Sequence, residues 1–236
     1  MSQFERCYSL LGNDYLDILG TKHIAVFGIG GVGSYVCEAL ARTGVGEITI
    51  VDSDVVSESN INRQIIALHS TVGQYKTDVM KSRIADINPD IKVNAKTIFY
   101  TPQNNDEFDF SKYDYVVDAI DTVTAKLDII KKAYENNIPI ISCMGTGNKL
   151  DATQFKISDI SKTNTCPLAR VIRRELKKLN IPKLNVLWSS ELPKNNINDE
   201  TKDDKPVPGS VGFVPSVAGL IIAGYVICDT LKIYNQ

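Results

Sequence analysis

The sequence predicts an α/β fold with a Rossmann-like three-layer αβα arrangement, in which a doubly wound, mainly parallel sheet lies between two layers of helices. Three observations predict it. Short β-branched runs alternate with helical segments, a glycine-rich turn follows the first run, and acidic residues stand where later runs end. The 236 residues are 43% hydrophobic and 23% charged, which is ordinary for a soluble globular protein with a sizeable core.

Strands and helices are expected to alternate over residues 23–143. The first strand is expected at 23–28, and the helix after it is ended by Gly44. The alternation then predicts further strands and helices between them, which should make the sheet parallel. The helices are expected at 31–44, 75–88 and 123–136, and the later strands at 47–52, 91–98, 114–121 and 138–143.

The pattern loosens after Asp151. Strands at 153–160 and 184–189, with a helix at 167–179 between them, are expected to extend the sheet as mixed strands. Residues 193–209 are polar and show no apolar periodicity, which predicts a mobile loop. The sequence shows no repeat and no clear linker, so we expect a single domain over 1–236.

Residues 211–228 carry no charge and are just long enough to span a membrane. Pro215 falls early in this stretch and would begin a helix near that point, which leaves a short apolar segment. We therefore expect a buried core or dimer helix and no stable membrane insertion.

Charge and cysteine content exclude several classes of protein. The net charge of −2 gives no overall attraction to nucleic acid, so such binding would need a local patch. No two of the five cysteines form a C-x-x-C pair, which argues against a disulfide framework and a thiolate zinc site. The N-terminus has no apolar core of signal-peptide length. These features favour the cytoplasm.

A G-x-G-x-x-G motif over 28–33 predicts a nucleotide site. It follows a strand and opens a helix, so the glycines allow close approach of phosphates to the helix N-terminus. Asp52 ends the next strand, where a ribose-binding acid belongs. This signal alone does not distinguish NAD from ATP. The glycines concerned are Gly28, Gly30, Gly31 and Gly33.

The stretch "SESNINRQ" (57–64) favours a triphosphate. It supplies polar and cationic groups just beyond Asp52, and Lys76 stands near the start of the next helix. Asp121 is expected at the carboxyl edge of the sheet, where ligands collect. A carboxylate beside phosphates is a candidate Mg²⁺ ligand. Each residue also has an ordinary surface role, but the set together describes a Mg–ATP site without a Walker A loop.

These motifs, G-I-G-G-V-G, "SNINRQ", G-x-x-K and D-A-I-D, resemble the ThiF/MoeB/HesA superfamily of E1-like adenylating enzymes. Longer stretches such as "EALARTGVGEITIVD" and "IPIISCMGTGNKLDATQFKISDISKT" resemble the tRNA threonylcarbamoyladenosine dehydratase branch. The likeness covers roughly 4–192 and resumes at "PGSVGFVPSVAGLIIAG".

The resemblance implies residue roles. The four glycines would line the nucleotide phosphates, Asp52 would bind the ribose, and Asp121 would hold Mg²⁺. The residues implied around ATP are Asn60, Arg63, Gln64 and Lys76. Arg6 matches an N-terminal arginine that in the family reaches the partner subunit's ATP site, which implies a homodimer in which catalysis uses Arg63, Lys76, Asp121 and Arg6.

The resemblance also implies a reaction. A carboxylate attacks the α-phosphorus of ATP and pyrophosphate leaves. In the dehydratase branch the carboxylate belongs to the threonylcarbamoyl group (t6A) of a tRNA, and the neighbouring carbamoyl group then cyclises with loss of AMP. The helix at 167–179 carries a cationic face that could follow an RNA backbone or be an ordinary solvated face. That face comprises Arg170, Arg173, Arg174, Lys177 and Lys178.

Other functions remain open at this point. The first alternative is an adenylyltransferase for the C-terminus of a ubiquitin-like sulfur carrier, although the C-x-x-C zinc pairs of many such enzymes are absent. The second is an NAD-dependent oxidoreductase, which leaves "SNINRQ" and Lys76 without a role. The third is a scaffold that only binds a nucleotide or a partner. Cys143 and Cys166 could be thioester nucleophiles, but buried structural roles are commoner for cysteine.

Overall fold

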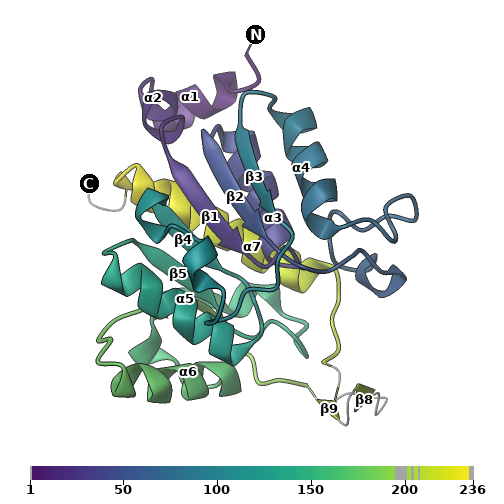
Figure 1. The fold of residues 1–236 in the computed structure, drawn as a ribbon, viewed down its shortest axis with the longest axis vertical. Coiled ribbons are helices and arrows are strands. Elements are labelled where there is room, and N and C mark those ends of the chain that lie inside the picture. Colours follow the sequence, from purple (N-terminus) through teal and green to yellow (C-terminus); the bar gives the residue numbers. More distant parts are fainter. Residues whose placement is uncertain (1, 195–200, 203–204, 207, 234–236) are drawn as a thin grey trace.

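A seven-stranded sheet forms the centre of the computed structural model, which describes residues 2–194, 201–202, 205–206 and 208–233 (Figure 1). The strand order is β3-β2-β1-β4-β5-β7-β6. All neighbours pair in parallel except β6, which is antiparallel to β7. The strands are β1 (His23–Phe27), β2 (Glu47–Val51), β3 (Lys92–Lys96), β4 (Tyr115–Asp118), β5 (Ile140–Cys143), β6 (Phe155–Asp159) and β7 (Asn185–Ser189).

Helices cover both faces of this sheet, as predicted. Three of them share one large apolar core on one face, while two pack on the opposite face. The first group is α3 (Gly33–Thr43), α4 (Lys76–Ile87) and α7 (Phe213–Thr230), and the second is α5 (Val123–Glu135) and α6 (Pro167–Lys178). Two short helices, α1 (Glu5–Leu11) and α2 (Tyr15–Leu19), lie at the amino end of β1 (Figure 1). The three-layer αβα prediction is confirmed.

Short 3₁₀ turns connect many of these elements. They are η1 (Glu58–Asn60), η2 (Asn105–Glu107), η3 (Phe110–Lys112), η4 (Ala152–Gln154) and η5 (Ile160–Lys162). Between β7 and α7, two short strands, β8 (Thr201–Lys202) and β9 (Lys205–Pro206), pair in antiparallel fashion. The polar loop predicted at 193–209 therefore contains a small hairpin, and its residues 195–200, 203–204 and 207 lie outside the described part of the chain.

The strand order reverses between β1 and β4, which are neighbours in the sheet while β2 and β5 lie outside them. Open α/β sheets bind ligands at such a switch point, in the crevice beyond the carboxyl ends of the strands. The strand predicted at 114–121 ends early, at Asp118. Residues 119–122 form the turn that leads into α5, which begins at Val123.

Helix α7 is the apolar segment of membrane-span length. It is long and apolar enough to cross a membrane, but half of its span-length window is buried. Gly219 lets it approach α3 closely, because a Cβ there would stand 2.4 Å from the Val32 carbonyl oxygen. The prediction of a core helix is confirmed, and α7 supports the start of α3.

Candidate active site

A cavity of about 780 Å³ opens at the strand-order reversal. Its walls come from the turns after β1, β2 and β4 and from the start of α4. Nearly all residues expected at a nucleotide site lie in this wall. Those that line it are Gly28, Gly30, Gly31, Asp52, Asn60, Arg63, Gln64, Lys76 and Asp121.

The glycine turn has two kinds of glycine. Gly28 has a φ of 89°, and a Cβ on it would stand 2.7 Å from the Ala119 carbonyl oxygen. Gly30 and Gly31 face the cavity. Gly33, by contrast, does not line the cavity, and its Cβ would stand 1.8 Å from the Gly28 carbonyl oxygen. The missing side chain of Gly33 therefore lets α3 pack tightly on the turn, and a contact between its amide and phosphates stays a prediction.

Asp52 holds the turn in place. Its Oδ2 accepts a hydrogen bond from the Ile29 amide at 2.7 Å, and its Oδ1 accepts one from the Asp54 amide at 2.9 Å. A carboxylate has about four acceptor positions. Asp52 can therefore keep both bonds and still accept from ribose hydroxyls.

Lys76 is buried at the cavity wall, with 5% of its surface exposed. Its Nζ lies 2.6 Å from Asp54 Oδ2 and 3.7 Å from Asp52 Oδ1. Burial removes most of the water that would compete with an anion for this ammonium. The Lys76 ammonium is therefore a buried cation at the cavity wall that could bind an anionic ligand.

Arg63 and Gln64 follow the turn η1. Arg63 donates to the Ser59 carbonyl at 2.7 Å and to Asn62 Oδ1 at 2.8 Å. Gln64 is 7% exposed, and its Oε1 has no hydrogen-bond partner among the described residues. An unsatisfied buried oxygen costs free energy, so a donor from a ligand or from water would satisfy it.

Asp121 stands in the turn between β4 and α5, with its side chain exposed to the cavity. Its carboxylate accepts a long hydrogen bond, 3.4 Å, from the Thr122 hydroxyl. An open carboxylate beside a phosphate pocket fits Mg²⁺, which takes few protein ligands and completes its shell with phosphate and water oxygens. The described residues contain no group of three or more His, Cys, Asp and Glu side chains that would form a complete protein cage.

Arg6 does not meet the cavity of its own chain. Helix α1 lies at the amino end of the sheet (Figure 1), where Phe4 is close to Gly44, whereas the cavity lies at the carboxyl end. Arg6 is exposed there. It can serve such a site only from another copy of the chain.

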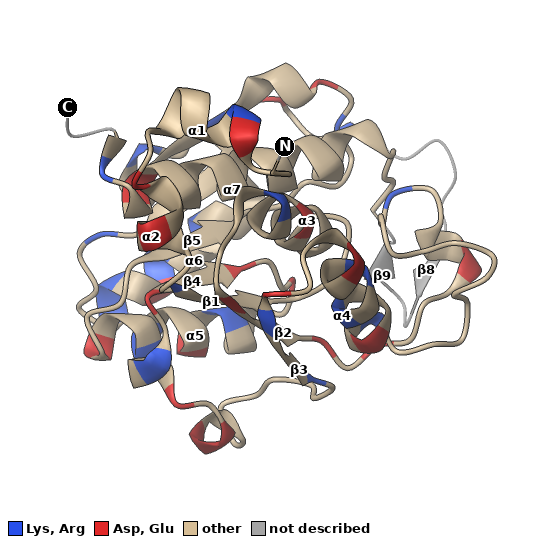
Figure 2. Ribbon diagram, turned by 90° about the horizontal axis from the view of Figure 1, so that it is seen from above, with Lys and Arg blue, Asp and Glu red and all other residues tan. Residues whose placement is uncertain are grey.

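Lys and Arg are spread over the whole fold among Asp and Glu (Figure 2). The five cations of α6 do not form one uniform face. Arg173 differs from the others, because it is half-buried and its Nη1 donates to the carbonyls of Ile160 and Thr163 and to the Thr163 hydroxyl. Arg174 and Lys178 both pair with Glu175. Arg170 and Lys177 are exposed, and no ion pair is found for either among the described residues.

The two candidate cysteine nucleophiles are buried, 5% exposed each. Burial raises the pKa of the Cys143 thiol to about 12, which leaves almost no thiolate at neutral pH. Cys166 precedes the first turn of α6 and is packed in an apolar cluster. Structural roles are therefore favoured for both.

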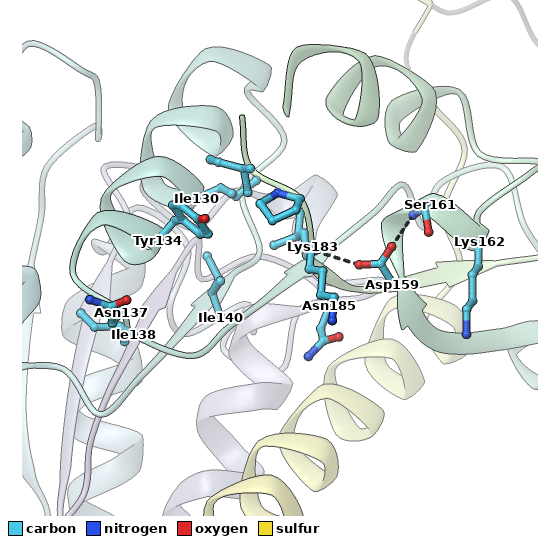
Figure 3. Close-up of a pocket in the computed structure, with 13 residues that line it drawn as sticks. Ile130, Tyr134, Asn137, Ile138, Ile140, Asp159, Ser161, Lys162, Lys183 and Asn185 are labelled. Carbon is cyan, nitrogen blue, oxygen red and sulfur yellow. Dashed lines mark hydrogen bonds between the residues drawn. The ribbon is translucent and has the colours of Figure 1, made fainter. Parts of the chain in front are cut away.

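A second hollow, of about 710 Å³, lies at the amino ends of β5 and β7 (Figure 3). Its floor is apolar, and its one carboxylate, Asp159, accepts hydrogen bonds from the amides of Ser161 and Leu184. This hollow brings together no catalytic constellation.

Sequence reasoning missed one buried charged network. Asp118, Lys126 and Ser142 are each fully buried and hydrogen-bonded to one another beneath the first cavity. Burial raises the pKa of Asp118, against the opposing effect of Lys126 and Ser142. The sequence feature that could have indicated this network is Lys126, a lysine on the apolar face of the helix predicted at 123–136.

The fold and the first cavity together define a Rossmann-type α/β protein whose cavity at the strand-order reversal combines a glycine turn, a buried lysine and an open carboxylate. The chain belongs to the ThiF family, whose model matches residues 4–233.

Comparison with known proteins gives a narrower likeness. The chain is 48% identical to a tRNA threonylcarbamoyladenosine dehydratase of Bacillus subtilis over 243 residues, covering 98% of this chain and 96% of that protein. It is also similar to crystal structures of the Escherichia coli enzyme TcdA. The complex with AMP gives a TM-score of 0.90 and the complex with ATP one of 0.88, each at 35% identity over 99% of this chain and 96% of the other.

Proposed function

We propose that this protein is an ATP-dependent tRNA threonylcarbamoyladenosine dehydratase. One observation carries the proposal: the cavity at the strand reversal gathers Arg63, Gln64, Lys76 and Asp121, a set suited to a triphosphate, in a chain 48% identical over nearly its whole length to a dehydratase of that name. The NAD alternative gives these residues no role.

The first step is adenylation. An oxygen of the threonylcarbamoyl carboxylate bonds to the α-phosphorus of ATP, the bond from that phosphorus to the bridging oxygen breaks, and pyrophosphate leaves with its electron pair. Negative charge grows on the leaving phosphates. Arg63 and Lys76 are placed to stabilise this charge electrostatically, as cations do in other phosphate chemistry.

The second step is cyclisation. The neighbouring carbamoyl group attacks the activated carbonyl, loses a proton as the ring closes, and AMP leaves. The attack is intramolecular, so its nucleophile has a high effective concentration. No covalent enzyme intermediate is required, which agrees with the burial of Cys143 and Cys166.

A divalent metal suits this site. We propose that Asp121 holds Mg²⁺, because its carboxylate is open to the cavity. Bound there, Mg²⁺ would neutralise charge on the phosphate oxygens. Gln64 Oε1 is free among the described residues to accept a hydrogen bond from the ligand or its water.

A homodimer would complete the site. Helix α1, which carries Arg6, lies at the far end of the sheet from the cavity (Figure 1), so a contribution of Arg6 to catalysis requires a partner subunit. The residues that line the cavity give no reason to add a sulfur-relay or ubiquitin-like protein as a partner.

The exposed cations of α6 are our candidates for tRNA contact, with Arg170 and Lys177 foremost and Arg174 and Lys178 beside them. Arg173 is a weaker candidate, because its Nη1 already donates to main-chain carbonyls. We place the enzyme in the cytoplasm as a single E1-like unit over 1–236, in agreement with its free cysteines.

Pyrophosphate release tests the proposal against its main rival. The purified protein is given Mg–ATP with t6A-containing tRNA, with the same tRNA lacking the threonylcarbamoyl group, or with a ubiquitin-like sulfur carrier ending in Gly-Gly. We expect release only with the first. Release with the sulfur carrier alone would replace the proposal with the adenylyltransferase alternative.

A further inference from the structure

A buried ion pair joins two strand ends beneath the ATP cavity. Lys126 Nζ lies 2.7 Å from Asp118 Oδ2, and both side chains are fully buried. The same ammonium donates to Ser142 Oγ at 3.2 Å and to the Cys143 carbonyl at 3.0 Å, while the Ser142 hydroxyl donates to Asp118. All three ammonium hydrogens therefore have an acceptor.

Stability alone does not explain such a pair. Removing two charges from water carries a penalty that their attraction offsets only in part, and apolar replacements of similar volume are often neutral or stabilising. A network that is fully satisfied nevertheless fixes one geometry for the segments it joins. The Lys126 network joins two segments of the chain, one after β4 and one after β5.

They are two walls of the cavity. Asp118 is the last residue of β4, and the turn after it carries Asp121. Cys143 is the last residue of β5, and the loop after it carries Thr146, which also lines the cavity. The Lys126 amide additionally donates to the Thr122 carbonyl at 2.9 Å, next to Asp121.

We propose that Lys126 is a positioning residue that ties the ends of β4 and β5 together and so sets where Asp121 and Thr146 stand in the ATP cavity. Lys126 does not touch the cavity itself. It acts through Asp118 and the Cys143 carbonyl. The inference rests on the proposed function, because it takes Asp121 to be the metal ligand.

The test measures metal binding and requires no tRNA. The main variant is the neutral double replacement Lys126→Met with Asp118→Asn, which removes both buried charges together and so avoids leaving one unpaired. Binding of Mn²⁺ in the presence of α,β-methylene-ATP is followed by electron paramagnetic resonance. We expect Mn²⁺ affinity to fall about tenfold, as is typical when groups supporting a metal ligand are removed, with little change in the unfolding temperature.

Two further variants keep the test decisive. Ser142→Ala removes one partner of the network while Lys126 and Asp118 remain, and should lower Mn²⁺ affinity by a smaller factor. Glu38→Gln is the matched control: Glu38 is 7% exposed on α3, bonded to Arg42 and Arg83 and absent from the cavity wall. It should lower stability and leave Mn²⁺ affinity unchanged.

Wild-type Mn²⁺ affinity in a folded double variant would overturn the inference. If the double variant does not fold, wild-type affinity in Ser142→Ala would overturn it instead, and so would an equal loss of affinity in Glu38→Gln. Failure of the proposed function would look different, since the wild type would bind Mn²⁺ with the analogue and yet leave t6A unchanged.

Discussion

The Lys76 ammonium lies between two aspartates of unequal exposure. Its Nζ is 2.6 Å from the Asp54 carboxylate, whose side chain is 65% exposed, and 3.7 Å from that of Asp52, whose side chain is 10% exposed. Asp54 can therefore turn toward solvent when phosphates enter, while Asp52 remains bonded to the Ile29 amide. The Lys76 ammonium would then pair with a phosphate group in place of the Asp54 carboxylate.

This relationship predicts different outcomes for the two partners. Lys76→Met should lower the rate of tRNA-dependent pyrophosphate release by about 10² to 10³, which is typical for loss of one electrostatic stabiliser. Asp54→Asn should have a much smaller effect, because we expect Asp54 to release Lys76 when ATP binds. Equal losses in the two variants, measured at saturating tRNA, would mean that Asp54 itself takes part in the reaction.

Arg6 predicts complementation between subunits. Arg6→Ala and Lys76→Met proteins should each be nearly inactive. When they are mixed, heterodimers have one site with both residues intact, so pyrophosphate release should partly return. Absence of recovery, with subunit exchange verified by differently tagged chains, would count against a role for Arg6 in the partner's site.

The exposed cations of α6 predict a salt effect. Arg170→Gln with Lys177→Gln should leave Mg–ATP binding unchanged and weaken tRNA binding. The slope of log affinity against log salt should fall by up to about two units if each residue neutralises one phosphate. A slope equal to that of the wild type would mean that the RNA contacts lie elsewhere.

Arg173→Gln is the control for that double variant, because it removes a cation from the same helix that is hydrogen-bonded within the protein. Its loss should lower the free energy of unfolding by about 1.5 to 3 kcal/mol, the range for hydrogen bonds to charged groups, because the carbonyls of Ile160 and Thr163 lose their hydrogen bonds from the guanidinium. The salt slope for tRNA should not change. Chemical denaturation and filter binding measure the two effects separately.

Glu38 predicts how stability depends on pH. Burial alone would raise the pKa of Glu38, but hydrogen bonds from Arg83 and Arg42 outweigh it and lower the pKa. A lowered pKa contributes stability above the unfolded-state value and loses it as pH falls through the folded-state value. The stability difference between wild type and Glu38→Gln should thus persist at pH 7 and shrink in acid. A difference that grows on acidification would contradict this.

Local patterns predicted the fold well. The glycine turn, the β-branched runs and Gly44 depend on neighbours in the chain, so the sheet and helix positions followed from them. Asp52 and Asp121 were predicted at the site because parallel strands end at one edge of the sheet. Lys76 was predicted there because it follows Gly73 near the start of the next helix.

Long-range contacts were not predictable in the same way. The sequence placed Arg173 on a cationic face, and only the fold shows that η5 lies beneath it. Gly33 was expected at the phosphates, and the approach of α3 to Gly28 also gives it a packing role. The Lys126 network was missed because its partners lie 8 and 16 residues away along the chain and meet only when α5 covers the sheet.

The mass of the modified nucleoside tests the central claim most directly. tRNA containing t6A is incubated with the protein and Mg–ATP, digested without strong base, and analysed by mass spectrometry together with the nucleotide products. We predict a nucleoside lighter than t6A by one water, with one AMP and one pyrophosphate formed for each. Unchanged t6A from a protein that is folded and binds ATP would contradict the account.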